Sequence, residues 1–227
     1  MRSTEHIIIT LDGPGGVGKT TLAQGLAEKL GIPYLDTGAM FRAAAWMLGQ
    51  SALDMEEQAL RSSLLPLRFE LKGSGKNSYL LLQGEVIGDQ VRTEEMGFLA
   101  SSLAKTEAVR NTLKEAQRLL GRDTSLVAEG RDMGSVVFPE AGCKFYLQAS
   151  PEIRAERRYK QLKEMGRDAD MQNLLEQIQQ RDFQDQNREL APLRPAPDAV
   201  HLDTGHLTPE EILDRMVAMV KSMEVSR

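Results

Sequence analysis

The sequence predicts an α/β fold: a doubly wound, mostly parallel sheet of about five strands with a small β-rich insertion. Short apolar runs that end at glycine or at a polar residue alternate with segments of helical spacing. Strands that alternate with helices indicate a parallel sheet covered on both faces. Residues 65–95 instead show β alternation interrupted by turn residues, which is typical of an antiparallel meander.

The N-terminal part of the chain begins with a strand and a helix. Residues 6–11 form an apolar run that stops near glycine, which predicts a buried strand. Residues 20–30 keep one apolar stripe and are followed by Gly31, as a helix and its end would be. A short strand at 33–38 and a helix at 39–48 come next.

The middle of the chain changes character. The turn "KGSGKN" and a break at Gly84 divide residues 65–95 into short strands. Helical spacing returns over 94–121 and predicts two helices. We therefore expect a core of residues 1–60 and 96–227, interrupted by an inserted meander at 61–95.

The second half returns to alternating strands and helices. Thr208 and Pro209 have the residue types expected at the cap and first position of the last helix. In chain order the sequence predicts strands at 124–130 and 143–150, two helices between Pro151 and Arg188, a strand at 198–204 and a helix at 208–223.

Composition narrows the class of protein. The 227 residues are 41% hydrophobic and carry a formal net charge of −5, which argues against nucleic acid as the main ligand. A single cysteine excludes an internal disulfide and a zinc cluster of cysteines. No long apolar segment or targeting signal is recognisable. We expect a cytoplasmic monomer without a membrane or nucleic-acid partner.

The most specific motif is a glycine-rich loop after the first strand. "GPGGVGKT" matches G-x-x-x-x-G-K-[ST] and lies between a predicted strand and a predicted helix. Such a loop turns consecutive N–H groups towards phosphate and adds the positive end of the helix. Lys19 would reach the β- and γ-phosphates, and Thr20 would bind Mg²⁺. The predicted ATP site comprises Gly13, Pro14, Gly15, Gly16, Val17, Gly18, Lys19, Thr20 and Thr21.

Arginine-containing segments follow two of the predicted strands. In "LDTGAMFR", Thr37 and Arg42 are equally well explained as a helix cap with a surface arginine or as ligand-binding residues. In "LVAEGRDMGSVVF", Glu129 stands where a water-mediated Mg²⁺ contact is usually made. Arg131 and Asp132 form either a structural ion pair or a ligand site, and the end of a strand favours a ligand.

Two further arginine clusters lie on predicted helices. Spacings of three and four residues place the members of each cluster on one helix face. Either face could be an ordinary solvated surface, but phosphoryl transfer needs cations around the moving group. The first cluster is Arg154, Arg157 and Arg158, and the second is Arg181, Asp185 and Arg188.

These motifs together resemble the bacterial cytidylate kinases, a family of nucleoside monophosphate kinases. The resemblance covers essentially the whole chain. It rests on "LDGPGGVGKTT", "YLDTGAMFRA", "VRTEEMGFLASSLAKTEAVR", "VAEGRDMGSVVFP" and "RDFQDQNRELAPLRPAPDAVHLDT". The β-rich insertion is also a hallmark of this family, where it belongs to the monophosphate-binding region.

The resemblance implies an ATP- and Mg²⁺-dependent phosphorylation of CMP and dCMP to CDP and dCDP. The helices at about 150–180 resemble a mobile lid that closes over ATP. Arg131 and the lid arginines Arg154, Arg157 and Arg158 would act with Lys19 in catalysis. The implied CMP site comprises Thr37, Arg42, Ser101, Arg110, Arg131, Asp132, Arg181, Asp185 and Arg188.

Physical chemistry agrees with these implied roles. Asp132 can accept a hydrogen bond from the cytosine amino group, which uracil lacks, so UMP would leave a polar group unpaired. The acceptor phosphate is already an anion, so the reaction needs alignment, charge neutralisation and exclusion of water. Two positions depart from the family: Phe41 replaces a common tyrosine, and Glu129 replaces an aspartate.

The sequence is also compatible with other functions. A kinase for UMP, AMP or shikimate could share the fold. A nucleotide-driven switch is a different class, but the chain lacks an N/T-K-x-D guanine-binding motif.

Overall fold

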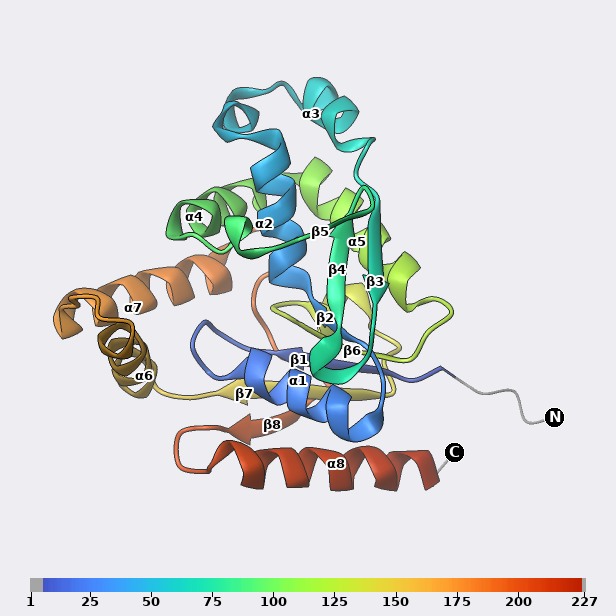
Figure 1. The fold of residues 1–227 in the computed structure, drawn as a ribbon, viewed down its shortest axis with the longest axis vertical. Coiled ribbons are helices and arrows are strands. Elements are labelled where there is room, and N and C mark those ends of the chain that lie inside the picture. The colour runs from blue at the N-terminus through green and yellow to red at the C-terminus, as the bar shows by residue number, and fades with distance from the viewer. Residues whose placement is uncertain (1–5, 226–227) are drawn as a thin grey trace.

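The structure, a computed structural model, describes residues 6–225 and has a central parallel sheet between two layers of helices (Figure 1). Neighbouring strands are parallel throughout this sheet. The predicted doubly wound sheet of about five strands is therefore confirmed. Its order is β2 (Tyr34–Asp36), β6 (Leu126–Gly130), β1 (Ile8–Asp12), β7 (Cys143–Gln148) and β8 (Val200–Asp203).

The strand register brings the predicted binding segments to one edge of the sheet. Asp12 at the end of β1 lies opposite Gly130 at the end of β6. Asp36 at the end of β2 lies opposite Glu129. The glycine-rich loop, the segment after β6 and the segment after β2 therefore all start at the carboxyl edge, where ligands bind in open α/β sheets.

Each face of the sheet packs against its own layer of helices. Helices α1 (Lys19–Leu30) and α8 (Pro209–Val225) cover one face, where Leu26, Phe145 and Met216 are buried. The opposite face packs on α2 (Thr37–Leu48), α4 (Glu94–Leu103) and α5 (Glu107–Gly121). Both layers are visible in Figure 1, where α1 lies in front of β1 and β7 and α8 runs along the bottom, below β8.

The β-rich insertion is present as a second, antiparallel sheet. Strands β3 (Phe69–Lys72), β4 (Tyr79–Leu82) and β5 (Glu85–Val86) pair in chain order. The turn between β3 and β4 rests on the end of α1, and a Cβ on Gly75 would lie 2.9 Å from Glu28 Cα. Helix α3 (Glu57–Leu64), which the sequence analysis did not predict, precedes this sheet.

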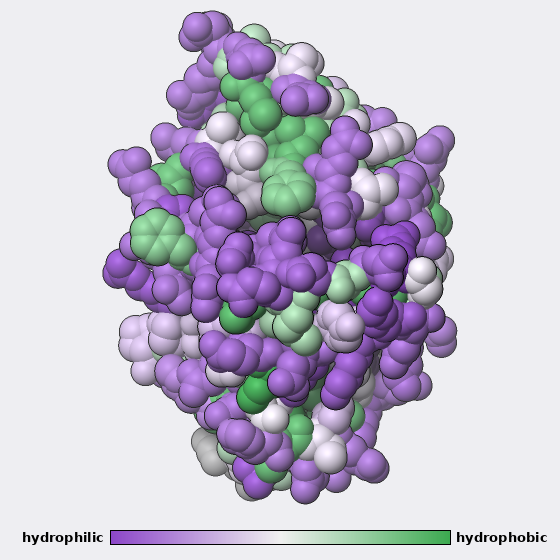
Figure 2. Space-filling view, turned by 90° about the vertical axis from the view of Figure 1, so that its left-hand side faces the viewer, coloured by the Kyte–Doolittle hydropathy of each residue, from purple (hydrophilic) through white to green (hydrophobic). Residues whose placement is uncertain are grey.

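Two helices, α6 (Pro151–Glu164) and α7 (Met171–Asn187), stand beyond the carboxyl edge of the sheet (Figure 1). Ser150 caps α6 by accepting a hydrogen bond from Ile153 N, with Pro151 in the first turn. Asp170 caps α7 in the same way through Asn173 N. The side of the molecule that carries α4, α6 and α7 is mainly hydrophilic (Figure 2).

The last helix begins as predicted. The Thr208 hydroxyl accepts a hydrogen bond from Glu211 N at 3.3 Å, and Glu211 Oε2 accepts one from Thr208 N at 2.8 Å. This reciprocal arrangement is a capping box, and Pro209 is the first helical residue. Within residues 6–225 no helix is long and apolar enough to cross a membrane.

Candidate active site

The glycine-rich loop joins β1 to α1. Gly16 and Gly18 have φ of 80° and 89°, a left-handed conformation that glycine adopts without strain. A Cβ on Gly13 would lie 2.3 Å from the Leu147 carbonyl oxygen, so glycine is required there by space as well. The loop sequence predicts its position correctly, between a strand and a helix N-terminus.

Lys19 is the first residue of α1 and is buried at the base of the loop. Its ammonium donates to the Pro14 carbonyl oxygen at 2.7 Å. Burial, followed by the positive charge of Arg131, lowers the pKa of Lys19 to about 7. Arg181 lowers it further, whereas Glu129 and Asp12 oppose the shift. A phosphate anion placed in the loop would restore the charged form.

Thr20 and Glu129 meet beside Lys19. Thr20 Oγ1 donates to Glu129 Oε1 at 2.7 Å, and the Tyr34 hydroxyl donates to the same carboxylate oxygen. Burial, with the nearby negative charge of Asp36, raises the pKa of Glu129. Among the described residues no cluster of three His, Cys, Asp or Glu forms a protein-only metal site.

Asp132, directly after Arg131, is buried between two arginines. Asp132 Oδ2 pairs with Arg110 Nη2 of α5 at 2.6 Å, and Oδ1 lies 3.5 Å from Arg188 Nη2. Arg188 follows the end of α7 and also donates to the Ala191 carbonyl oxygen at 2.6 Å. The structure therefore brings together three predicted residues that are distant in sequence. Asp132 pairs with Arg110, whereas Arg131, the partner considered from the sequence, pairs with Asp185.

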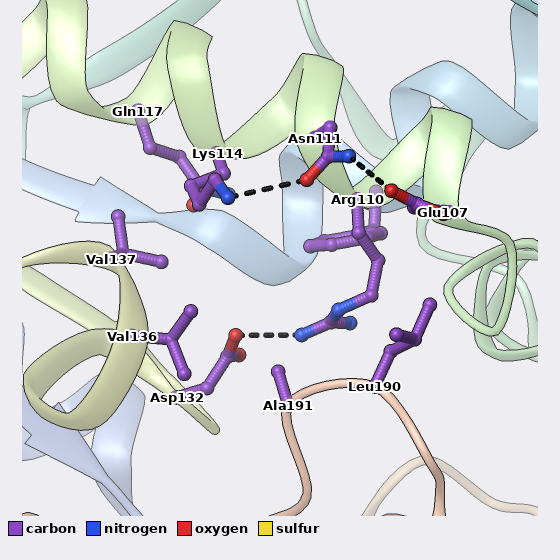
Figure 3. Close-up of a pocket in the computed structure, with 11 residues that line it drawn as sticks. Glu107, Arg110, Asn111, Lys114, Gln117, Asp132, Val136, Val137, Leu190 and Ala191 are labelled. Carbon is purple, nitrogen blue, oxygen red and sulfur yellow. Dashed lines mark hydrogen bonds and ion pairs between the residues drawn. The ribbon is translucent and has the colours of Figure 1, made fainter.

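This ion pair borders a pocket of about 170 Å³. Helix α5 forms one side of the pocket, and the segment with Leu190 and Ala191 forms the opposite side (Figure 3). The Arg110 guanidinium lies 5.7 Å from the centre of the Phe41 ring, which also lines the pocket. A ring of this kind offers a flat apolar surface beside paired charged groups, as a nucleobase requires.

Arg131 points towards the glycine-rich loop. Its Nε donates to Asp185 Oδ2 of α7 at 2.9 Å. A Cβ on Gly15 would lie 3.7 Å from Arg131 Nη2 and 4.0 Å from Arg181 Nη1. Burial alone would raise the pKa of Asp185, but Arg131 and Arg181 more than offset it, and the pKa lies below its usual range. Two cations therefore stand beside the glycine-rich loop, one from the segment after β6 and one from α7.

The segment after β2 supplies the remaining predicted residues. Thr37 Oγ1 donates to the Glu129 carbonyl oxygen at 2.6 Å, so it fastens α2 to β6. It is not the cap of α2, because Asp36 accepts the capping hydrogen bond from Ala39 N at 2.8 Å. Arg42 lies 3.3 Å from Asp36 and its buried Nε has no partner. Ser101 lies half-buried on α4.

The three arginines of α6 have different surroundings. Arg154, only 2% exposed, pairs with Asp182 of α7 and donates to the Gly15 carbonyl oxygen at 3.0 Å. Arg157 donates to Thr204 beside β8. Arg158 lies 3.4 Å from Glu94 of α4. Arg154 therefore binds a carbonyl group of the glycine-rich loop. A direct contact of these three arginines with the reacting phosphates stays a prediction.

Several residues of the site were not singled out from the sequence. Asp12, Tyr34, Asp36 and Asp182 each bind a predicted site residue or its immediate neighbours. All four lie inside or beside the motifs quoted above, but the motifs assigned no role to these particular side chains. Their partners are brought close by the fold, so spacing in the sequence could not have identified them.

A family model, "Cytidylate kinase", matches residues 9–222. The chain belongs to the cytidylate kinase family. A cytidylate kinase from Maridesulfovibrio salexigens is 55% identical over 92% of this chain and 94% of its own, and one from Nitratidesulfovibrio vulgaris is 52% identical over 96% and 94%. Among solved structures, a shikimate kinase from Bacteroides thetaiotaomicron has a TM-score of 0.49 at 15% identity over 95% and 98% of the two chains. Family membership rests on the family model and the sequence relatives, and makes the chain a nucleoside monophosphate kinase, a transferase.

Proposed function

We propose that this cytidylate kinase family member transfers the γ-phosphoryl group of ATP to CMP and dCMP, forming CDP and dCDP. The observation that carries the proposal is the buried Arg110–Asp132 pair, which lies beside the pocket and whose aspartate directly follows Arg131. A carboxylate there accepts from the cytosine amino group, and the guanidinium donates to the ring nitrogen and carbonyl. Adenine and uracil do not present that combination of groups.

The glycine-rich loop, residues 13–21, holds the triphosphate on its N–H groups. Lys19 contacts the β- and γ-phosphates in this assignment. The hydroxyl of Thr20 and the carboxylate of Glu129 meet at 2.7 Å, and such oxygens suit Mg²⁺, which also takes phosphate oxygens and water. Thr20 would bind the ion directly and Glu129 through water, and the ion would neutralise phosphate charge there.

The acceptor nucleotide lies on the other side of Arg131. Arg42, Arg131 and Arg188 hold its phosphate, and the unpartnered Nε of Arg42 is a donor suited to this. Arg181 and Asp185 face the ribose and phosphate, with Thr37 nearby. Ser101, Arg110 and Asp132 bind the base.

Catalysis in this site consists of alignment and electrostatic stabilisation. The acceptor phosphate needs no general base because it is already ionised near neutral pH. Lys19 and Arg131 neutralise charge on the moving phosphoryl group. Helices α6 and α7 form the lid at about 150–180, which closes over ATP and brings Arg157 and Arg158 nearer, excluding water.

A coupled assay with ATP and a panel of acceptors tests this function. CMP and dCMP should be phosphorylated with a kcat/KM at least tenfold above that for UMP, AMP or shikimate. A tenfold preference for any of the other acceptors would refute the proposal. ATP hydrolysis without an acceptor, and without CDP formation from CMP, would instead indicate a nucleotide-driven switch.

Asp132→Asn tests the assignment of the base contact. The asparagine amide can donate to the uracil carbonyl, so discrimination against UMP should fall by about 10²-fold while KM for ATP changes little. Asparagine also keeps an acceptor towards Arg110, which avoids leaving that charge wholly unpaired. Unchanged CMP-to-UMP selectivity in a folded Asp132→Asn enzyme would place the base elsewhere.

A further inference from the structure

Asp12 is the last residue of β1 and directly precedes the glycine-rich loop. The residue is buried, with 3% of its surface exposed. Each carboxylate oxygen accepts one backbone hydrogen bond: Oδ1 from Met133 N and Oδ2 from Gly134 N, both at 2.8 Å. No predicted role of the loop uses this carboxylate, although it lies at the junction of the two halves of the site.

The two N–H groups belong to the segment that carries the acceptor-binding residues. Met133 and Gly134 directly follow Arg131 and Asp132. The backbone ladder between β1 and β6 ends at the pair Asp12–Gly130, so it does not reach this segment. The two hydrogen bonds of the Asp12 side chain connect β1 to Met133 and Gly134, which come directly after Asp132 in the chain.

The segment 133–137 is closely docked on β1. A Cβ on Gly134 would lie 2.8 Å from Thr10 Oγ1, so only glycine allows this approach without displacement. Val136 N and Val137 N both donate to the Asp132 carbonyl oxygen, at 2.9 and 3.1 Å, which closes a tight turn behind Asp132. The backbone of Asp132 is therefore fixed by a turn whose first two N–H groups are held by Asp12.

Keeping the buried Asp12 carboxylate ionised is unfavourable in free energy. Burial, with a smaller contribution from the negative charge of Asp132, raises the pKa of Asp12 to about 6. The hydrogen bonds from Gly134 and Met133 and the charge of Lys19 act in the opposite direction. An apolar residue would fill this space with less loss of free energy, so we infer that the carboxylate is there to hold the two N–H groups of Met133 and Gly134 in place.

We propose that Asp12 is a positioning residue for base selection: it fixes the Arg131–Asp132 segment relative to the glycine-rich loop. Asp12 contacts neither nucleotide in this role. It sets the distance and orientation between the loop that holds the donor and the carboxylate that recognises the acceptor base. The inference rests on the proposed function, because base selection is defined for CMP against UMP.

Asp12→Asn is the direct test. Asparagine matches aspartate in size, but its amide nitrogen must face one of the two N–H donors and repels it. We expect KM for CMP to rise about tenfold and the CMP-to-UMP ratio of kcat/KM to fall about tenfold, while KM for ATP changes less than threefold. Asp12→Glu keeps the charge and displaces the carboxylate by one methylene, and it should shift selectivity in the same direction.

Ile9→Val is the matched control. Ile9 lies three residues earlier on the same strand, is fully buried, and packs in the core on the α1 and α8 face, whereas Met133 and Val137 pack in the core on the opposite face. This variant should keep wild-type selectivity. Thermal denaturation of all variants separates loss of stability from loss of selectivity, because general destabilisation would not change the ratio between two acceptors.

The outcomes test this inference separately from the proposed function on which it rests. If the wild-type enzyme prefers CMP and both Asp12 variants keep its CMP-to-UMP ratio within twofold, the positioning role is refuted and the proposed function stands. A wild-type enzyme that does not phosphorylate CMP refutes both. Loss of selectivity in either Asp12 variant, with retained selectivity in Ile9→Val, supports the inference.

Discussion

Lys19 shows how this site depends on its ligand at the scale of one residue. Its ammonium is buried among Arg131 and Arg181, with Glu129 and Asp12 as the counter-charges. These surroundings lower its pKa to about 7, whereas its proposed task is to contact the most negative part of ATP. The free protein therefore favours a neutral Lys19 above pH 7, and the bound triphosphate favours the charged form.

We expect ATP binding to take up a proton at alkaline pH. Below pH 7 Lys19 is already protonated and uptake should be small; by pH 8 it should approach one proton per site. Isothermal titration calorimetry in buffers of different ionisation enthalpy measures this directly. Lys19→Met removes the titrating group and should abolish the uptake, and a wild-type enzyme without proton uptake at pH 8 would contradict the prediction.

The residues predicted from sequence are those within chemically distinctive motifs. Lys19, Arg131 and Asp132 were identified because a phosphate loop and a polar strand end each imply a ligand. Asp12 and Asp182 were not, because each acts on a partner from another part of the fold: Asp12 binds a backbone more than a hundred residues away. A carboxylate that binds backbone N–H groups leaves no partner pattern in the sequence.

At the scale of elements, α6 and α7 are joined to the glycine-rich loop through one buried arginine. The Arg154 guanidinium donates to the carbonyl oxygens of Ala149 and Gly15, and pairs with Asp182 through both nitrogens. A phosphate-binding loop needs its N–H groups inward and its carbonyls outward. Arg154 donates to one of these outward carbonyls, that of Gly15, and so links the loop to α6 and α7, the proposed lid.

Asp182→Asn should loosen this connection. The neutral amide keeps one acceptor but leaves the Arg154 charge without its counter-ion in a buried site, so stability should fall by about 1–3 kcal/mol. KM for ATP should rise more than KM for CMP. Hydrogen exchange should speed up in α6 and α7 first, which mass spectrometry can follow. Equal changes in exchange across the whole sheet would show that the pair serves general stability only.

The regular elements were largely predictable, and the exception has a physical cause. Buried strands and capped helices carry their pattern locally, as the capping box at Thr208 shows. Helix α3 has eight residues and buries only Leu60 and Leu64. A helix this short is not stable alone and forms because its neighbours cover it, so local sequence gives a weak signal.

At the scale of the whole molecule, the strand order decides which segments meet. The order β2-β6-β1-β7-β8 places the glycine-rich loop between the segments that follow β6 and β7. Alternating strands and helices predict a parallel sheet, but they do not determine this order. The resemblance, not the pattern of elements, therefore led us to expect one site; in the structure Arg131 and Arg181 approach Gly15.

The final prediction concerns movement of α6 and α7 as a unit. Both helices are exposed to solvent on their outer sides, and Arg158 meets α4 through an exposed ion pair at 3.4 Å, which is weak enough to exchange. An open site would allow water to attack ATP, so we expect α6 and α7 to close over the bound nucleotides. Phe98 of α4 and Phe183 of α7 are 70% and 68% exposed and offer labelling positions on the two helices.

Spin labels on Phe98→Cys and Phe183→Cys should move closer when CMP and a non-hydrolysable ATP analogue are both present. The natural Cys143 does not interfere, because it is buried and burial raises the pKa of its thiol to about 11. Labels at the exposed positions Glu140→Cys and Asp214→Cys serve as the control and should keep their distance, since neither position lies on the proposed lid. A ligand-independent distance between the first pair, in an enzyme that still phosphorylates CMP, would rule out closure by α6 and α7.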